Sequence, residues 1–258
     1  MIAHFVPGLV LSTALMAATT ASAVEIKMVA SNAVKEPYHE LIPQYERTTG
    51  NKVRVDFVGT GDIVQRIGKN GEVADVVVGA SFTIDDLIKQ GRLVPGRIDL
   101  AKSIIGVALR PGAPRPDLSS GESLKRYLLA GNKIIISGGP SGIYLKDLFQ
   151  KMGIANQIKM TQLAPGASAS EAVAHGEGDI GFTQVSEILA VKGVEYLGPV
   201  PADIQQVTTF SAGIHKNAPQ ADAAKGLLKF LTAPAAVSVL KKTGLEPGLM
   251  RRRVLPSP

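Results

Sequence analysis

The 258-residue chain contains no cysteine. Without cysteine it can form neither disulfide bonds nor thiolate metal sites, and it has no cysteine nucleophile. Tryptophan is absent as well, and aromatic residues make up only 5% of the sequence. Nucleic-acid-binding grooves combine basic residues with aromatic side chains that stack on bases. The composition therefore argues against a nucleic-acid partner, although the net charge is +6.

Part of that positive charge lies in a short C-terminal tail. Arg251, Arg252 and Arg253 follow Pro247-Gly248 and precede two further prolines. This pattern is typical of a solvated, disordered tail, which we expect over residues 249–258. The remaining positive balance is mild and is compatible with a small acidic ligand.

Long apolar runs are missing after the first residues of the chain. Residues 6–18 are mostly apolar, and Ala21-Ser22-Ala23 offers the small residues that a signal peptidase reads. We therefore predict a signal peptide over residues 1–23, export to the periplasm and a mature chain with no stable membrane insertion. The alternative is a short membrane anchor, but the run is short against the roughly 20 residues that span a bilayer.

Apolar β-branched runs alternate with amphipathic helical patterns along the rest of the chain. Such alternation is typical of α/β units whose parallel strands are covered on both faces. Strands are expected at residues 25–29, 52–58, 75–78, 104–109, 133–136, 179–182 and 207–214. Helices are expected at residues 38–49, 62–69, 84–90, 124–129, 143–152, 170–174, 221–231 and 235–242.

Two segments are candidates for paired connections between lobes. Residues 103–109 and 207–212 are placed so that the chain between them forms a lobe inserted into the first. The resulting organisation is a first lobe at residues 24–105 and 207–248 and a second lobe at residues 106–206. Ligands of such sheets bind in the crevice at the carboxyl ends of the strands.

Three apolar runs stop at small polar residues, after which a helical pattern begins. The turns are Ser31-Asn32-Ala33, Gly59-Thr60-Gly61-Asp62 and Ser137-Gly138-Gly139-Pro140-Ser141-Gly142. Strand-to-helix turns leave free backbone N–H groups and the positive end of a helix dipole facing the crevice. Three such turns predict a small, negatively charged ligand.

The same turns carry a resemblance to a known family. Val29-Ala30-Ser31, Phe57-Val58-Gly59-Thr60-Gly61 and Pro140-Ser141-Gly142-Ile143-Tyr144 resemble turns of the periplasmic molybdate-binding proteins, as do residues 74–78 and 176–181. The resemblance covers nearly all of the expected mature chain. It implies a two-lobed α/β fold of the periplasmic solute-binding type (type II), with the ligand cleft between the lobes.

In that family the oxyanion is held by two hydroxyl side chains, backbone N–H groups and a tyrosine hydroxyl. Carried over by position, the resemblance assigns the hydroxyls to Ser31 and Thr60, and the backbone contacts to Ser141-Gly142 and a turn near Gly166. The tyrosine position falls on Gln184, which departs from the family pattern. A glutamine offers both a donor and an acceptor, so it suits an organic acid at least as well as a metal oxyanion.

A narrower resemblance concerns the second half of the chain. Gln184-Val185-Ser186-Glu187, residues 198–201 and residues 210–213 resemble a subgroup of this fold that includes periplasmic aconitate isomerases. The subgroup implies a tricarboxylate substrate, interconverted between trans- and cis-aconitate by allylic proton transfer. The alternative is a non-catalytic binding protein that delivers molybdate, another oxyanion or a small carboxylate to an ABC permease. We expect a monomer with no cofactor.

The candidate contacts also have structural interpretations. Ser31 and Thr60 could act as helix N-caps. The Ser141-Gly142 turn could need glycine only for its backbone angles, and Tyr144 could either face the ligand or pack in the core.

A tricarboxylate also requires a cation, and arginine holds carboxylates in a bidentate manner. Arg66 follows the Thr60 turn, and Lys35 lies near the first turn, although both residue types are more often solvated surface charges. The expected substrate-binding set is Ser31, Asn32, Thr60, Gly61, Arg66, Ser141, Gly142, Tyr144 and Gln184.

An isomerase further requires a base near the acidic carbon of its substrate. His39, Glu187 and a serine or tyrosine hydroxyl are candidates, while His175 and His215 have structural interpretations, and the sequence does not select a base. Other chemistries lack their motifs. There is no HExxH pattern or His/Cys cluster for a metal, no dinucleotide-binding glycine pattern and no GxSxG turn.

Overall fold

The computed structural model describes residues 23–248. The predicted signal peptide, apart from Ala23, and the predicted tail at residues 249–258 lie outside the described residues. The strands are β1 (Glu25–Ser31), β2 (Lys52–Val58), β3 (Val76–Ala80), β4 (Ile98–Leu109), β5 (Lys133–Ile136), β6 (Lys159–Gln162), β7 (Ile180–Gln184), β8 (Glu195–Pro199), β9 (Val207–Ile214) and β10 (Glu246–Pro247). The α-helices are α1 (Lys35–Thr49), α2 (Thr60–Ile63), α3 (Ser81–Lys89), α4 (Gly121–Leu129), α5 (Pro140–Lys151), α6 (Ala169–Ala174), α7 (Val185–Leu189), α8 (Ala221–Leu231) and α9 (Ala236–Lys242).

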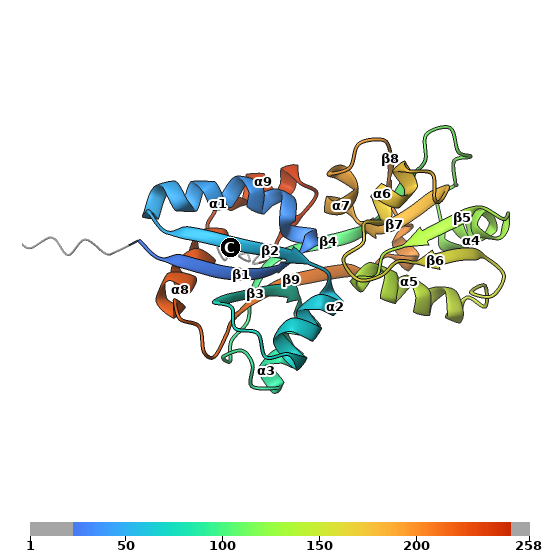
Figure 1. The fold of residues 1–258 in the computed structure, drawn as a ribbon. Helices are drawn as coiled ribbons and strands as arrows, with labels where there is room; N and C mark the ends of the chain where they lie inside the picture. The colour runs from blue at the N-terminus through green and yellow to red at the C-terminus, as the bar shows by residue number, and fades with distance from the viewer. Residues whose placement is uncertain (1–22, 249–258) are drawn as a thin grey trace, which may run out of the picture.

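One long strand joins the two lobes. The strand order is β2-β1-β3-β9-β4-β7-β5-β6, and β8 and β10 also pair with β4. Ile98–Ile104 of β4 pairs with β9, whereas Ile105–Leu109 pairs with β7 and β8. The first half of β4 therefore belongs to the lobe of β1, β2 and β3, and the second half to the lobe of β5, β6 and β7. Figure 1 shows the two groups of elements side by side, connected by β4 and β9.

The sheet is mixed rather than wholly parallel. The pairs β1–β2, β1–β3, β5–β6 and β5–β7 are parallel, as predicted for the α/β units. The pairs of β9 with β3 and β4, and of β4 with β7, are antiparallel. The antiparallel direction follows because β4 and β9 carry the chain out of the first lobe and back. The lobe boundaries predicted at 105/106 and 206/207 stay predictions, and β4 runs unbroken through the first of them.

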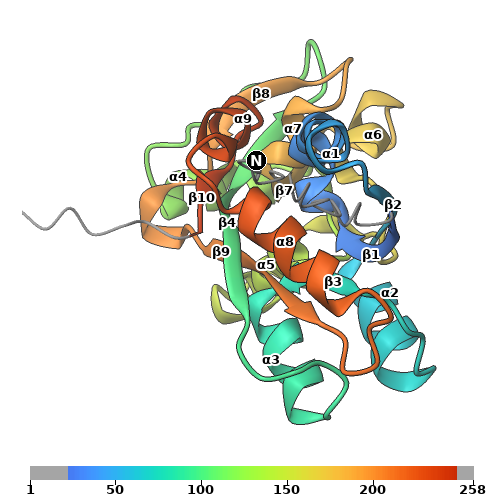
Figure 2. The ribbon, with the colours of Figure 1, turned by 90° about the vertical axis from the view of Figure 1, so that its left-hand side faces the viewer.

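Each lobe has its own apolar core. In the first lobe, buried side chains of α1, α8 and α9, including Tyr38 and Leu228, pack on one face of the strands. Ile63, Ile84 and Leu87 pack on the opposite face, so this part of the sheet is covered on both sides. Figure 2 shows α1 and α9 on one side of the strands and α3 on the other. The second lobe packs α4 and α5 on its strands in a separate cluster that contains Phe149. Two cores connected by two strands make a fold in which the crevice between the lobes can widen.

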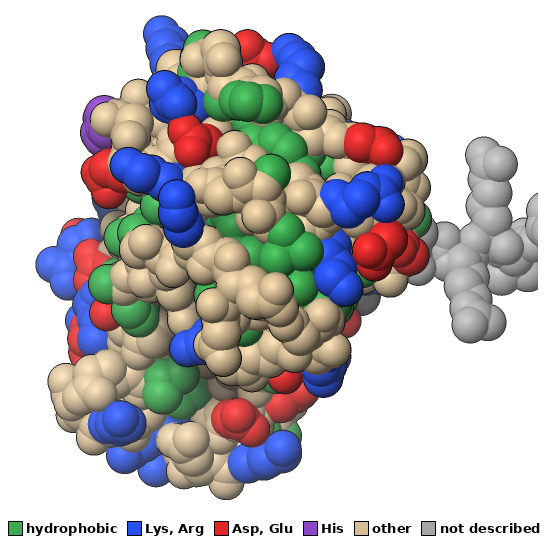
Figure 3. Space-filling view, turned by 90° about the vertical axis from the view of Figure 1, so that its right-hand side faces the viewer, with side chains coloured by type: hydrophobic (Ala, Val, Ile, Leu, Met, Phe, Trp, Pro, Cys, Tyr) green, Lys and Arg blue, Asp and Glu red, His purple; other side chains and the backbone are tan. Residues whose placement is uncertain are grey.

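The outer face of the second lobe carries charges of both signs. Figure 3 shows Lys and Arg side chains interspersed with Asp and Glu around this face, with hydrophobic side chains between them. Ion pairs in this lobe include Arg110 with Asp179 and Lys151 with Asp147. Basic residues on this face are thus dispersed rather than gathered into one continuous patch.

No single helix among residues 23–248 has both the length and the apolar character needed to cross a membrane. One pair, α8 followed by α9 with a bend of 66° between them, meets that criterion by length and composition when the two helices are taken together.

Candidate functional site

A small cavity lies between the lobes, where the carboxyl ends of β1, β2 and β7 meet the start of α5. Its volume is about 20 Å³, which is room for about one water molecule. Five of the expected contact residues, from four separate segments of the chain, line this inner cavity together. They are Ser31, Asn32, Thr60, Ser141 and Gln184.

The two hydroxyl residues of the first lobe have different structural roles. Ser31 ends β1, and its Oγ accepts a hydrogen bond from the Ala33 N–H at 3.4 Å, which caps the 3-10 turn Asn32–Val34. Thr60 begins α2, but the residue that caps this helix is Gly59, whose N–H donates to Oδ2 of Asp62 at 3.1 Å. The N-cap interpretation therefore holds for Ser31 and fails for Thr60.

The Thr60 hydroxyl is buried without a partner. The residue is only 6% exposed, and Oγ1 has no hydrogen-bond partner among residues 23–248. Leaving a buried hydroxyl unpaired costs about 1–3 kcal/mol. Because such groups are rare in native proteins and often serve a function, an unpaired hydroxyl at a cavity is a candidate ligand contact.

The turn into α5 is held by Ser137. Its Oγ accepts from the N–H groups of Gly139 at 3.3 Å and Gly142 at 3.2 Å, and it lies 2.9 Å from Oγ of Ser141. A Cβ on Gly142 would lie 1.7 Å from the carbonyl oxygen of Ser137, so only glycine fits there. This corrects the expectation that the Gly142 N–H contacts the ligand, because that N–H donates a hydrogen bond within the turn.

Gln184 ends β7 and is buried, with 1% of the residue exposed. Its Nε2 donates to Oγ1 of Thr208 at 3.1 Å, and its Oε1 has no partner among the described residues. The Thr208 hydroxyl can donate as well as accept, so the amide can rotate by 180° and keep this bond. Gln184 can therefore offer the cavity either an acceptor or a donor.

Glu187 brings a carboxyl group to the same cavity. It lies in the first turn of α7, where Oε2 accepts from the Thr183 hydroxyl at 2.5 Å and from the Gln184 N–H at 3.4 Å. No residue between 23 and 248 donates a hydrogen bond to its Oε1. Burial raises the pKa of Glu187 above the usual glutamate value, against the opposing effect of these two hydrogen bonds. A carboxyl group with a raised pKa at a cavity is suited to general acid–base chemistry.

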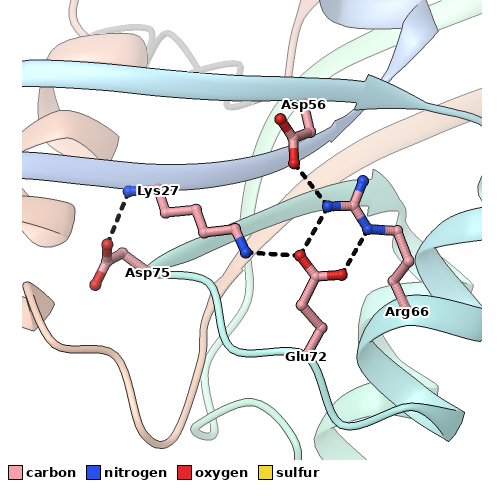
Figure 4. Close-up of polar contacts among 5 residues, drawn as sticks. All are labelled: Lys27, Asp56, Arg66, Glu72 and Asp75. Carbon is pink, nitrogen blue, oxygen red and sulfur yellow. Dashed lines mark hydrogen bonds and ion pairs between the residues drawn. The ribbon is translucent and has the colours of Figure 1, made fainter.

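Arg66 does not reach the cavity, which corrects the expectation that it holds a substrate carboxylate. Figure 4 shows its guanidinium turned toward Glu72 and Asp56. Nε lies 2.7 Å from Oε2 of Glu72, and Nη2 lies 2.7 Å from Oε1 of Glu72 and 2.6 Å from Oδ2 of Asp56. The same Glu72 also accepts from Lys27 Nζ at 2.7 Å. These contacts lower the pKa of Glu72 to about 2, and the hydrogen bonds from Arg66 have a larger effect than the one from Lys27. Arg66 is therefore a structural cation.

Gly61 and Tyr144 also have other partners. A Cβ on Gly61 would lie 2.8 Å from Cγ of Pro165, so this glycine allows the second lobe to approach α2. The Tyr144 hydroxyl donates to the carbonyl oxygen of Ile204 at 3.0 Å, and the residue lines a separate groove beyond Pro140.

The histidines lie outside the cavity lining of the described chain. His39 is exposed on α1, where its ring faces Phe57 at a centroid distance of 5.7 Å. His175 is exposed at the end of α6. His215 is buried beside Asp75, at the opposite end of β3 from the cavity. Of the base candidates, Glu187 and the serine hydroxyls of Ser31 and Ser141 line the cavity, whereas His39 does not.

Several lining residues were not predicted from the sequence. Ser137 follows the same strand-end pattern as Ser31, so that pattern could have identified it. Phe210 and the partner of Gln184, Thr208, lie on β9 and carry no such signal. The lining residues of the described chain include no Lys or Arg, and no group of three His, Cys, Asp or Glu in residues 23–248 could hold a metal. The polar side chains that this part of the chain offers to the cavity are therefore the neutral hydroxyl and amide groups and the carboxyl group of Glu187.

Known proteins share this architecture. The family model described as bacterial extracellular solute-binding protein matches residues 26–246. An aconitate isomerase from Pseudomonas sp is 31% identical over 253 residues, covering 93% of this chain and 96% of that protein. The molybdate-binding protein ModA of Azotobacter vinelandii is 27% identical over 240 residues, covering 88% of this chain and 92% of that protein. The solved periplasmic molybdate-binding protein of Azotobacter vinelandii matches with a TM-score of 0.70 and 22% identity, over 90% of this chain and all of that one.

Proposed function

This chain belongs to the bacterial extracellular solute-binding proteins, and from that premise we propose that it is a periplasmic isomerase that interconverts trans- and cis-aconitate. The observation that carries the proposal is Glu187. A cavity whose other polar groups suit an anion also contains a carboxyl group with a raised pKa. A charged carboxylate opposes the binding of an anion, whereas a proton-transfer enzyme requires such a group. The similarity to an aconitate isomerase supports the choice of substrate.

The reaction needs an anchor for the substrate and one base. Ser31, Thr60 and Ser141 would donate hydrogen bonds to one substrate carboxylate. Glu187 in its ionised form would remove a proton from the methylene carbon next to the double bond. The C–H electrons would then spread over the allylic carbons and their carboxylates, where hydroxyl groups and helix N-termini stabilise the developing charge. Return of the proton to the other end of the allylic system moves the double bond and can yield the other geometrical isomer.

Glu187 has a structural contribution as well as the proposed chemical one. Its Oε2 completes a capping box at the start of α7 by accepting from the Gln184 N–H. This contact and the Thr183 hydrogen bond fix the carboxyl group by one oxygen. The other oxygen, Oε1, is the atom that we assign to the proton.

The second candidate function is a non-catalytic binding protein that delivers a small anion to an ABC permease. Two observations favour it. The ModA relative is a molybdate-binding protein, and an inner cavity with room for about one water molecule suits a compact oxyanion better than a whole tricarboxylate. Under this alternative, Glu187 would serve only as the capping residue of α7.

Proton NMR of the purified protein mixed with trans-aconitate tests the proposal. We expect cis-aconitate to appear with the native chain and to be lost with Glu187→Gln. A glutamine keeps the capping box, because its side-chain oxygen still accepts, and circular dichroism checks the fold. Glu177→Gln makes the same change at an exposed loop residue. It is the matched control and should retain activity.

An unchanged trans-aconitate signal with the folded native chain would overturn the isomerase. Stabilisation by molybdate, tungstate or sulfate in a thermal-shift series would then support the transport alternative.

A further inference from the structure

A second, larger pocket adjoins the inner cavity between the same two lobes. This outer pocket has a volume of about 330 Å³ and shares Asn32, Gly166, Ala167 and Glu187 with the inner cavity. Sites for small organic ligands are typically about 300–1,000 Å³. The inner cavity, with room for about one water molecule, can therefore admit at most one carboxylate group, whereas the outer pocket has room for the rest of an organic acid.

The outer pocket contains one cation among several carboxylates. Lys35 begins α1, is exposed, and is the only Lys or Arg among the described residues that line this pocket. It forms no ion pair with any residue between 23 and 248. Glu36, Glu171 and Glu187 line the same pocket and repel an anion. A negatively charged group in the outer pocket is therefore expected beside Lys35.

Glu187 lies at the boundary, because it lines both spaces. We propose that a tricarboxylate spans the two pockets, with one carboxylate in the inner cavity and a second beside Lys35 in the outer pocket, so that Glu187 faces the carbons between them. This inference rests on the proposed function and makes Lys35 the residue that distinguishes a tricarboxylate from a compact oxyanion. A tetrahedral oxyanion would occupy the inner cavity alone and would have no contact with Lys35.

Binding of tricarballylate, the saturated tricarboxylate that cannot isomerise, tests this assignment by calorimetry. Succinate is the comparison ligand, because it has only two carboxylates. Lys35→Gln should weaken tricarballylate binding by about tenfold, the order expected for loss of a charge-assisted contact. Glu171→Gln removes a repelling charge from the same pocket and should strengthen binding by about two- to threefold. Lys229→Gln, an exposed residue of α8, makes the same charge change away from the pocket and should have no effect.

A general loss of folding would weaken tricarballylate binding in both pocket variants, so it would not produce opposite effects in Lys35→Gln and Glu171→Gln. Equal affinities for tricarballylate in the native chain, Lys35→Gln and Lys229→Gln would overturn the assignment, as would the absence of tricarballylate binding to the native chain. An equal loss of succinate and tricarballylate affinity in Lys35→Gln would also overturn it, because the effect would not depend on the additional carboxylate.

The two proposals can fail separately. If the native chain leaves trans-aconitate unchanged but Lys35→Gln still weakens tricarballylate selectively, the isomerase fails and the two-pocket assignment holds. If the native chain isomerises aconitate and Lys35→Gln does not raise KM for it, the assignment fails and the isomerase holds.

Discussion

Gly59 of the first lobe and Gly166 of the second lobe bring their backbones into direct contact beside the inner cavity. A Cβ built on Gly59 would lie 2.2 Å from the backbone nitrogen of Gly166 and 2.8 Å from the carbonyl carbon of Pro165. Asn32 adds a hydrogen bond across the same gap, from Nδ2 to the carbonyl oxygen of Gly166 at 3.2 Å. The closed arrangement of the lobes thus depends on the absence of a side chain at residue 59.

The first prediction concerns this contact. Gly59→Ala should weaken tricarballylate binding at least about tenfold, because the added methyl group forces the lobes apart where Gly166 and Ala167 cover the cavity. The backbone at residue 59 is extended, with φ −74° and ψ 161°, so alanine adopts it without strain and the fold should persist. Calorimetry measures the affinity, and a thermal melt checks the fold.

Gly226→Ala is the control for that experiment. Gly226 lies on α8, outside the lining of the inner cavity, and a Cβ there would have its nearest neighbour 3.7 Å away, at Oη of Tyr45. The affinity of this control variant for tricarballylate should stay within about threefold of the native value. Equal binding by the two alanine variants would contradict the role of the Gly59–Gly166 contact.

The second prediction uses the unpaired hydroxyl of Thr60. Thr60→Val keeps the shape of the side chain and removes an unsatisfied buried polar group, so the free energy of unfolding without ligand should stay constant or rise by up to about 1–3 kcal/mol. Ligand affinity should fall at least about tenfold. Denaturant unfolding and calorimetry measure the two quantities. A purely structural hydroxyl would give the reverse result, a loss of stability with unchanged affinity.

Ser31→Ala provides the contrast, because Ser31 caps the turn after β1. Loss of the cap should lower the free energy of unfolding by about 1 kcal/mol, in addition to weakening ligand binding.

The third prediction concerns the pH dependence of turnover. Glu187 must be ionised to accept a proton, so kcat/KM should rise with pH through the raised pKa of this group. Thr183→Val removes a hydrogen bond that lowers that pKa and should move the rising limb of the profile to higher pH, whereas Thr183→Ser should leave it in place. A limb that stays in place in Thr183→Val would argue against Glu187 as the base.

The same pKa shift affects stability with a definite sign. Because the folded chain holds the Glu187 proton more strongly than the unfolded chain, its contribution is present below the ordinary glutamate pKa and is lost as pH rises through the raised value. The stability of Glu187→Gln relative to the native chain should therefore increase with pH across that window.

Much of the fold could be predicted from the sequence because several strands carry apolar patterns typical of β-structure, either a continuous run, as at residues 134–136, or alternation, as at residues 52–58. Residues 52–58, 133–136 and 207–214 were predicted with the bounds that the structure has. The strands β6 and β8 were missed because they are only partly buried, and because β6 is mostly polar while β8 contains a glycine and a proline. The five-residue helix α7 was missed as well, because it is too short to show a helical period.

The placement of candidate site residues could be predicted where it depends on strand ends. The prediction failed where the role of a residue depends on partners that are distant in sequence. Ser31, Thr60 and Ser141 each lie where a strand gives way to a helix or a 3-10 turn, so local sequence indicates where they lie. Arg66 follows the same turn, but its role depends on Asp56 and Glu72, and charge spacing alone did not identify them.

The fourth prediction separates this ion-pair network from the ligand. Arg66→Met should lower the free energy of unfolding by about 1–2 kcal/mol at neutral pH, because Glu72 and Asp56 lose a partly buried, bidentate partner. The lowered pKa of Glu72, about 2, means that the stabilisation is present above the ordinary glutamate pKa and is lost as pH falls toward 2. The difference between variant and native chain should therefore shrink in acid, while tricarballylate affinity at neutral pH stays unchanged. Lys151→Met, which breaks an exposed pair with Asp147, should change the free energy of unfolding much less, because solvent screens that pair. If Arg66→Met is fully folded but binds tricarballylate much more weakly than the native chain, Arg66 contributes to ligand binding and this prediction is wrong.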